Sequence, residues 1–209
     1  MITDADNIVM RFPGKEANKL YFTADTHFCH RHIMDYCTQP FKSIEEHDEA
    51  LIENWKKTVP EDGIVFHLGD VGFGLSTRLR EIIDDLPGKM YLVIGNHDLR
   101  HLDVIKSRFE KIFWQVTLEL GKRYVVLNHY PFLCYAGTYK HKHNTYQLFG
   151  HVHSGPNSTT GLDIPRLVNL FPWQYDVGVD NNNFAPVSWP AIQAVMEKRR
   201  QDITAKSGS

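Results

Sequence analysis

Residues 63–70 read GIVFHLGD and residues 89–98 read KMYLVIGNHD, and these two stretches decide the class of fold. Each begins as a short run of Val, Ile, Leu and aromatic residues and ends in glycine followed by polar, metal-binding side chains. Short apolar runs bounded by Gly, Pro or Asn are typical of buried strands rather than of helices. The same form recurs as KLYFTAD at 19–25, RYVVLNH at 123–129 and TYQLFGHVH at 145–153.

Helical patterns lie between these runs. The clearest, SIEEHDEALIENWKKTV at 43–59, opens with Ser43 as N-cap and Glu46 three residues later, which is a capping box. Further helices are predicted at 76–86 and 188–201, with a weaker one at 99–109. Strands alternating with helices predict a layered α/β domain, in which the carboxyl ends of the strands carry the ligand site.

The totals limit the classes of function. The chain has 209 residues and a formal net charge of -2, so we expect one domain over 1–209 with a flexible tail at about 203–209, and no strong binding of duplex nucleic acid. Its three cysteines, Cys29, Cys37 and Cys134, are widely spaced, which argues against a disulfide framework. Neither a signal peptide nor a membrane span is evident, so we expect a cytoplasmic protein.

Metal-binding side chains follow all five strand-like runs. The candidate ligands are Asp25, His27, Asp70, Asn96, His129, His151 and His153. Two divalent cations would bring four positive charges, whereas the two carboxylates return only two negative ones. The remaining positive charge favours binding of an anionic ester. Imidazole-rich sets favour Mn, Fe, Zn, Ni or Co over Ca or Mg, and we expect two such ions, with Mn favoured.

These motifs, taken in order, resemble the calcineurin-like metallophosphoesterase superfamily. The matching segments are DTH at 25–27, GD at 69–70, GNHD at 95–98, NH at 128–129 and GHVH at 150–153, within a region of roughly 20–180. The resemblance implies a four-layer α/β/β/α sandwich of two mixed sheets flanked by helices. It also implies hydrolysis of phosphate esters by attack of a metal-bridging hydroxide at a dinuclear centre.

The resemblance further implies a role for each motif residue. The first metal would be held by Asp25, His27 and His153, the second by Asn96, His129 and His151, with Asp70 bridging both. His97 would act as general acid or transition-state stabiliser, and Asp98 would orient it. The loop after the first motif contains His30 and Arg31, which are candidates for substrate contact.

Departures from the family pattern narrow the range of substrates that we expect. The GD motif continues as GDVGFG, without the arginine that protein phosphatases of the superfamily carry, and GNHD stands where they have GNHE. A small bacterial or phage-type phosphoesterase is favoured, with phosphodiesters ahead of monoesters and a nucleotide as one candidate substrate. The alternatives are a nuclease that acts on short single-stranded nucleic acid and a catalytically silent metal-binding module.

Several other polar or aromatic residues are expected to lie on solvated surfaces, in a loop or in the core rather than in the site. His47 and Asp48 lie in a charged run and are expected on a solvated helix face. The basic residues at 140–143 either attract phosphate groups to the site or belong to a solvated loop. The turn-rich segment 154–174 is expected to be a loop, and its aromatic residues and Tyr175 to pack in the core. Asp180 is expected outside the metal shell.

Overall fold

Two mixed β-sheets form the centre of the protein in the computed structural model, which describes residues 9–37, 40–74, 77–135, 145–153 and 170–207. The first sheet has the order β10 (Val187–Ser188), β2 (Leu20–Thr23), β3 (Ile64–His67), β4 (Lys89–Val93) and β5 (Phe109–Phe113). The second has the order β1 (Val9–Arg11), β6 (Val116–Leu120), β7 (Arg123–Leu127), β8 (Thr145–Phe149) and β9 (Gln174–Asp176). Strands β2 to β5 are parallel, as are β7 to β9.

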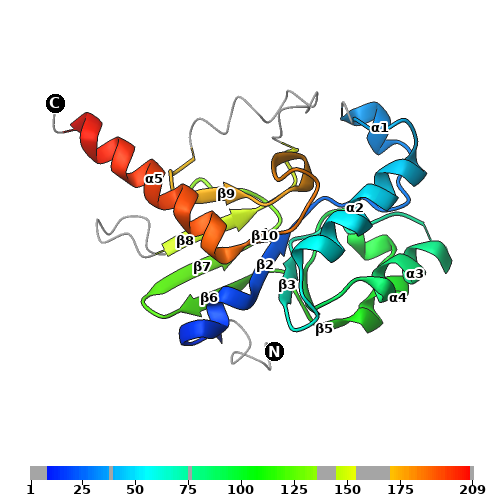
Figure 1. The fold of residues 1–209 in the computed structure, drawn as a ribbon, viewed down its shortest axis with the longest axis horizontal. Coiled ribbons are helices and arrows are strands. Elements are labelled where there is room, and N and C mark those ends of the chain that lie inside the picture. Colours follow the sequence, from blue (N-terminus) through cyan, green and yellow to red (C-terminus); the bar gives the residue numbers. More distant parts are fainter. Residues whose placement is uncertain (1–8, 38–39, 75–76, 136–144, 154–169, 208–209) are drawn as a thin grey trace.

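Helices flank the sheets on opposite sides (Figure 1). The helices are α1 (Ile33–Tyr36), α2 (Ile44–Thr58), α3 (Thr77–Asp85), α4 (Leu102–Ile105) and α5 (Trp189–Ser207), with 3-10 turns η2 (Gly14–Lys19), η3 (Asp98–Arg100), η4 (Lys106–Arg108) and η6 (Val179–Asn181). Helices α1 to α4 gather on the side of the first sheet, whereas α5 packs against β2, β9 and β10. This arrangement confirms the predicted α/β sandwich. No helix in the described part of the chain is long and apolar enough to cross a membrane.

Helix α2 begins where the capping pattern predicts. The Ser43 hydroxyl accepts a hydrogen bond from the backbone N–H of Glu46 at 3.2 Å, while the Glu46 carboxylate accepts one from the backbone N–H of Lys42. The helix buries a face that includes His47 and Asp48, which are 1% and 5% exposed. The prediction of a solvated face for this pair was therefore wrong. The neighbouring glutamates point to solvent, but 47 and 48 share a face with the buried Leu51 and Trp55.

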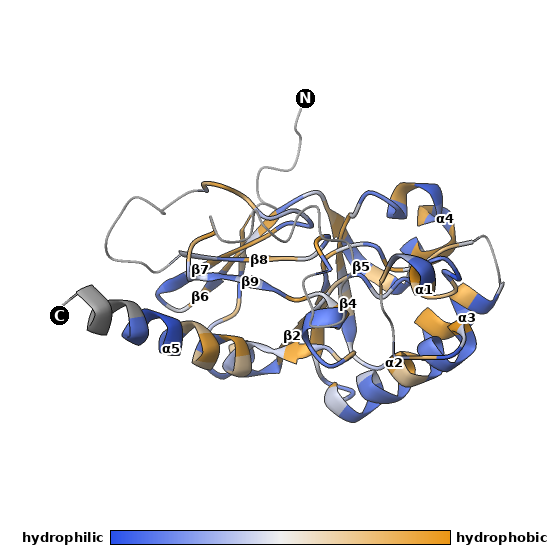
Figure 2. Ribbon diagram, turned by 90° about the horizontal axis from the view of Figure 1, so that it is seen from above, coloured by the Kyte–Doolittle hydropathy of each residue, from blue (hydrophilic) through white to orange (hydrophobic). Residues whose placement is uncertain are grey.

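Two hydrophobic clusters hold the layers together. One lies between the sheets and against α5, with Phe22, Phe66 and Tyr91 stacked in succession across three neighbouring strands. The other fills the space between the first sheet and helices α2 to α4. In Figure 2, hydrophobic and hydrophilic stretches alternate along α2 and α3, as expected of helices that cover a core on one side. Each large side chain buried in this way contributes about 1.5–3 kcal/mol.

Some elements differ from the sequence-based expectation. The weak helix predicted at 99–109 is broken into η3, α4 and η4, and residue 109 begins β5 instead. Strands β1, β5, β6, β9 and β10 were not predicted individually, although β6 alternates buried and half-buried residues as a strand should. Helix α5 continues to Ser207, beyond the end predicted at residue 201. Ser76, the first residue of the helix predicted at 76–86, lies outside the described residues.

Candidate metal centre

All seven candidate ligands lie just beyond the carboxyl ends of strands, and the two sheets bring these ends together. Asp25 follows β2, and its carboxylate accepts a hydrogen bond from the backbone N–H of His151 after β8, at 2.8 Å. His129 follows β7, and its Nδ1 atom bonds the carbonyl oxygen of Leu68 after β3, at 2.7 Å. Each contact joins one sheet to the other, so residues more than a hundred positions apart in sequence share one site.

The first group consists of Asp25, His27 and His153, each of which places a ligand atom within 4.8 Å of the other two. Nδ1 of His153 bonds Asp180 Oδ2 at 2.6 Å, which leaves Nε2 for the group. Nδ1 of His27 faces Nδ1 of His30 at 3.2 Å. A histidine ligand is commonly oriented in this manner, through the ring nitrogen that does not bind the metal.

The second group consists of Asp70, His129 and His151, whose ligand atoms also lie within 4.8 Å of one another. The Leu68 carbonyl can only accept, so Nδ1 of His129 carries the proton and Nε2 presents a lone pair. That Nε2 atom lies 3.0 Å from Oδ1 of Asn96, which also carries lone pairs. A cation would be bound by both atoms. The structure therefore brings Asn96 to the second group, where the resemblance places it.

Asp70 connects the two groups. Its Oδ2 atom lies 3.8 Å from His27 Nε2 in the first group and 3.5 Å from His129 Nε2 in the second. Its other oxygen, Oδ1, accepts the backbone N–H of His97 at 3.0 Å, which fixes the carboxylate. A carboxylate oxygen held between two sets of ligands has the position that a bridging ligand requires.

The buried polar atoms of the site are better explained by bound divalent cations than by a site without ions. Asp25 Oδ1 and His27 Nε2 are buried, and neither has a hydrogen-bond partner among the described residues. Burial raises the pKa of Asp25 and of Asp70, and it lowers the pKa of His27 and brings that of His129 to about 4. Unpaired buried carboxylates and unpaired imidazole nitrogens are costly, and a bound cation would offset that cost.

Backbone strain is concentrated in the ligand loops. Asp25, His27, Asp70, His151 and His153 all have φ between 45° and 73°, in the left-handed region that residues with a Cβ rarely adopt. Each such residue costs on the order of 1–3 kcal/mol. These five candidate ligands are most of the eight non-glycine residues with positive φ in the described part of the chain; the others are Cys29, Asn183 and Phe184.

Close packing explains the glycines of two motifs. A Cβ atom on Gly95 would collide with the Asp70 carboxylate, and one on Gly150 would lie 2.5 Å from Asp25 Oδ2. Both motifs therefore need glycine in order to let the backbone approach the carboxylates.

Asp98 has a different position from the one we expected. Its buried carboxylate accepts backbone N–H groups of Asp70, Val71 and Gly95 at 2.7–2.9 Å. No hydrogen bond to the His97 ring is found among the residues that the structure describes. Asp98 thus ties the GNHD loop to the GD loop and acts on the backbone rather than on His97.

His97 lies at the mouth of the site. Its side chain is 41% exposed, and its Nε2 atom lies 4.0 Å from Asp70 Oδ2. The ring also packs 5.9 Å from the ring of His27 and 4.8 Å from Phe73. A group placed there can reach both solvent and the space between the two groups of ligands.

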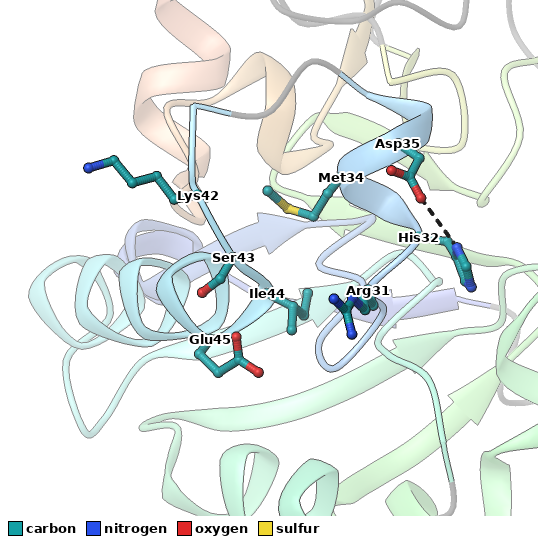
Figure 3. A pocket seen from close by; sticks show the side chains of 8 residues that line it. All are labelled: Arg31, His32, Met34, Asp35, Lys42, Ser43, Ile44 and Glu45. Carbon is teal, nitrogen blue, oxygen red and sulfur yellow. Dashed lines mark hydrogen bonds and ion pairs between the residues drawn. The ribbon is translucent and has the colours of Figure 1, made fainter.

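The two candidates for substrate contact separate in the structure. His30 stacks on Phe73 with ring centroids 3.6 Å apart and meets His27, so it lies in the wall of the site. Burial lowers its pKa to about 4. Arg31 instead lines a neighbouring hollow of about 280 Å³, beside Ile44 and Glu45 of the first turn of α2 (Figure 3). The structure therefore brings His30 to the ligands but places Arg31 outside them.

Sequence reasoning missed two supports of the ligand loops. Asp180 bonds His153, and Cys37 lies with both of them in a further group of potential ligand atoms. Asp48 accepts the backbone N–H of Cys29 with both carboxylate oxygens, at 3.0 and 3.2 Å. Cys29 has φ 61°, a value that favours glycine, so this bond stabilises a strained turn. Neither acidic residue belongs to a motif. Asp180 was expected outside the metal shell, which agrees with its position, but its bond to His153 was not predicted, and the sequence carried no signal for Asp48.

The remaining predictions concern residues away from the ligands. Trp173 and Tyr175 pack against the core between the sheets, and Phe171 stacks on Trp173 with centroids 5.3 Å apart. His67 is buried and bonds Thr26. The basic residues at 140–143 and most of the loop at 154–174 lie outside the described residues.

Comparisons with known proteins agree with the fold and leave the activity open. No protein-family model matches the chain. An uncharacterized protein of Methanocaldococcus jannaschii is 29% identical over 182 residues, which cover 86% of this chain and 92% of that protein. The gene 66 protein of Mycobacterium phage L5 is 28% identical and covers 64% of this chain and 77% of its own length.

One solved structure shows the same fold. A protein of unknown function from Aquifex aeolicus superposes with a TM-score of 0.62 at 25% identity, over 84% of this chain and 98% of that one. A predicted phosphoesterase from Streptococcus pneumoniae reaches a TM-score of only 0.31 at 16% identity, over 64% of this chain and 62% of its own, and carries no argument about function.

Proposed function

We propose that the chain is a dinuclear, metal-dependent phosphoesterase of the calcineurin-like type. The observation that carries the proposal is the position of Asp70, whose Oδ2 atom lies within 4 Å of imidazole nitrogens from both ligand groups. A single ion would need only one group, and a structural ion would not need the partly exposed His97 ring beside it. The five strained ligand positions and the unpartnered Asp25 and His27 atoms support the same proposal.

The ligand set also indicates what the site binds. When present, two divalent cations would lower the pKa of a bound water and stabilise the charge that develops on the leaving oxygen. The protein supplies two carboxylates against them, so the site keeps a net positive charge that attracts a phosphate ester. Imidazole and amide ligands favour Mn, Fe, Zn, Ni or Co, and we favour Mn.

The protein groups around the ions have separate tasks. Asp98 holds two ligand loops in register through three backbone hydrogen bonds. The exposed ring of His97 is placed where it can give a proton to a leaving alkoxide, which is worth about 10²–10⁴-fold in rate. A proton donor is most useful for poor leaving groups, so we favour phosphodiesters.

A paired assay tests the proposal. Purified protein loaded with Mn²⁺ is compared on bis(p-nitrophenyl) phosphate and on p-nitrophenyl phosphate, with bound metal measured by elemental analysis. We expect turnover of the diester that is lost after chelation and returns with Mn²⁺. Protein that holds two ions per chain and hydrolyses neither ester would refute the enzymatic proposal and favour a silent metal-binding module.

A further inference from the structure

Tyr130 stands out among the residues around the second group. Its ring packs edge-on against the rings of His129 and His151, with centroids 4.9 and 4.6 Å apart. Its hydroxyl lies 3.4 Å from Oδ1 of Asn96. The residue is nevertheless 43% exposed. Tyr130 therefore contacts three proposed ligands and solvent at the same time.

The backbone around Tyr130 is held by three side-chain amides, two of which are buried. Its N–H donates to Asn128 Oδ1, and its carbonyl accepts from Nε2 of Gln147, both at 2.9 Å. Gln147 is fully buried and also accepts the N–H of Phe132, while the buried Gln174 bonds both Gln147 and the Phe132 carbonyl. Buried amides are costly unless they are fully bonded, and these two are directed at one short turn.

An exposed aromatic residue does not need such a turn for stability. Fixed placement of a side chain that faces solvent is instead typical of groups that must meet a ligand in a defined geometry. The phenol is a neutral donor with a freely rotating O–H. Its acceptor in this structure, Asn96 Oδ1, is distant and faces His129 Nε2 at 3.0 Å. A closer oxygen of a bound anion would be the better acceptor.

We propose that Tyr130 is a substrate-contacting residue, whose hydroxyl donates a hydrogen bond to a non-bridging oxygen of a phosphate group bound at the second ligand group. Its ring keeps the imidazoles of His129 and His151 in place. The inference rests on the proposed function, because it assumes that a phosphate group is the ligand. It adds a recognition contact from outside the family motifs, on the side of the site opposite to the first group.

Two substitutions separate the hydroxyl from the ring. Tyr130→Phe removes only the donor, so we expect unchanged Mn²⁺ content and a KM for the diester that rises about tenfold, the size expected for one hydrogen bond to a charged group. Tyr130→Ala also removes the ring, and we expect it to lower Mn²⁺ binding as well. Tyr124→Phe and Tyr124→Ala are matched controls, since Tyr124 is 45% exposed and lies near the opposite end of β7.

Binding of inorganic phosphate to Mn²⁺-loaded protein, measured by calorimetry, gives a readout that does not depend on turnover. We expect phosphate to bind about tenfold more weakly to Tyr130→Phe than to wild type, with Tyr124→Phe unchanged. Equal phosphate affinity and equal KM in Tyr130→Phe and wild type would overturn the inference, as would loaded wild-type protein that binds no phosphate. Wild type that binds phosphate but hydrolyses no ester would overturn the proposed function alone, and the Tyr130→Phe comparison would still decide the contact.

Discussion

The two ligand groups of the candidate centre are supported in different ways. In the first, the spare histidine nitrogens meet side chains, since His153 bonds Asp180 and His27 faces His30. In the second, His129 bonds a backbone carbonyl, and the loop of Asp70 is held by backbone bonds to Asp98. Substitutions of the hydrogen-bond partners of the ligand histidines should therefore weaken the first group, whereas the second depends on the packing of the two sheets and on the ring of Tyr130.

The groups also differ in their surroundings. The stacked rings of His30 and Phe73 wall the first group, whereas the second lies beside the exposed Tyr130. Five substitutions test this division of the site, beginning with one that breaks both groups and ending with one at a residue outside them.

Asp70→Asn should have the largest effect, because it removes the anion that both groups share. We expect activity to fall to background and bound Mn²⁺ to fall below two ions per chain, as measured by hydrolysis assay and elemental analysis. Asp62→Asn is the control, since Asp62 is exposed and lies just before β3. Full metal content in Asp70→Asn would contradict the bridging position.

His97→Ala should leave both groups loaded and impair only the chemistry. The ring is exposed and is not one of the predicted ligands, so we expect normal Mn²⁺ content. Turnover of an alkyl diester, which has a poor leaving group, should fall by about 10²–10⁴-fold, and that of the activated p-nitrophenyl ester much less. His32→Ala, at another exposed histidine, is the control. Equal losses on both esters would exclude the role as proton donor.

Asp180→Asn should weaken the first group alone. The carboxylate that orients His153 is lost, and substitutions of such partners typically reduce metal affinity by about 10–100-fold. Asn96→Ala is the counterpart in the second group. Titration of metal-free protein with Mn²⁺ should show one weakened site in each variant, with Asp103→Asn as an exposed control. Loss of both sites together in Asp180→Asn would show that the groups are not separately supported.

His67→Gln should have the smallest effect, which is a change in the pH dependence of stability. Burial, and the charge of His129, lower the pKa of His67 from 6.5 to about 3. Between these values the unfolded chain binds a proton that the folded one does not, so wild-type stability falls as the pH falls. The variant has no histidine at this position, so its stability does not fall for this reason. The stability difference between the two should shrink by up to about 2 kcal/mol from pH 7 to pH 5, measured by urea unfolding without metal. A constant difference would contradict the assigned pKa.

The sequence was sufficient to predict the strands that carry ligands, because each ends in a motif with a chemical reason. Because all the candidate ligands follow strand ends, the sequence also predicted that they lie close together, whereas their division into two groups was implied only by the resemblance. The residues that hold the ligand loops in place were harder to predict. Asp48 sits among solvated glutamates and Asp180 follows a short strand, and only the tertiary packing brings them to Cys29 and His153. The order of the outer strands likewise depends on long-range pairing that no local pattern contains.

Anomalous X-ray diffraction from a crystal loaded with Mn²⁺ tests the central claim most directly. We predict two peaks on either side of Asp70 Oδ2, about 3.5–4 Å apart, one among Asp25, His27 and His153 and the other among Asn96, His129 and His151. A single peak, or peaks that Asp70 does not join, would contradict the account.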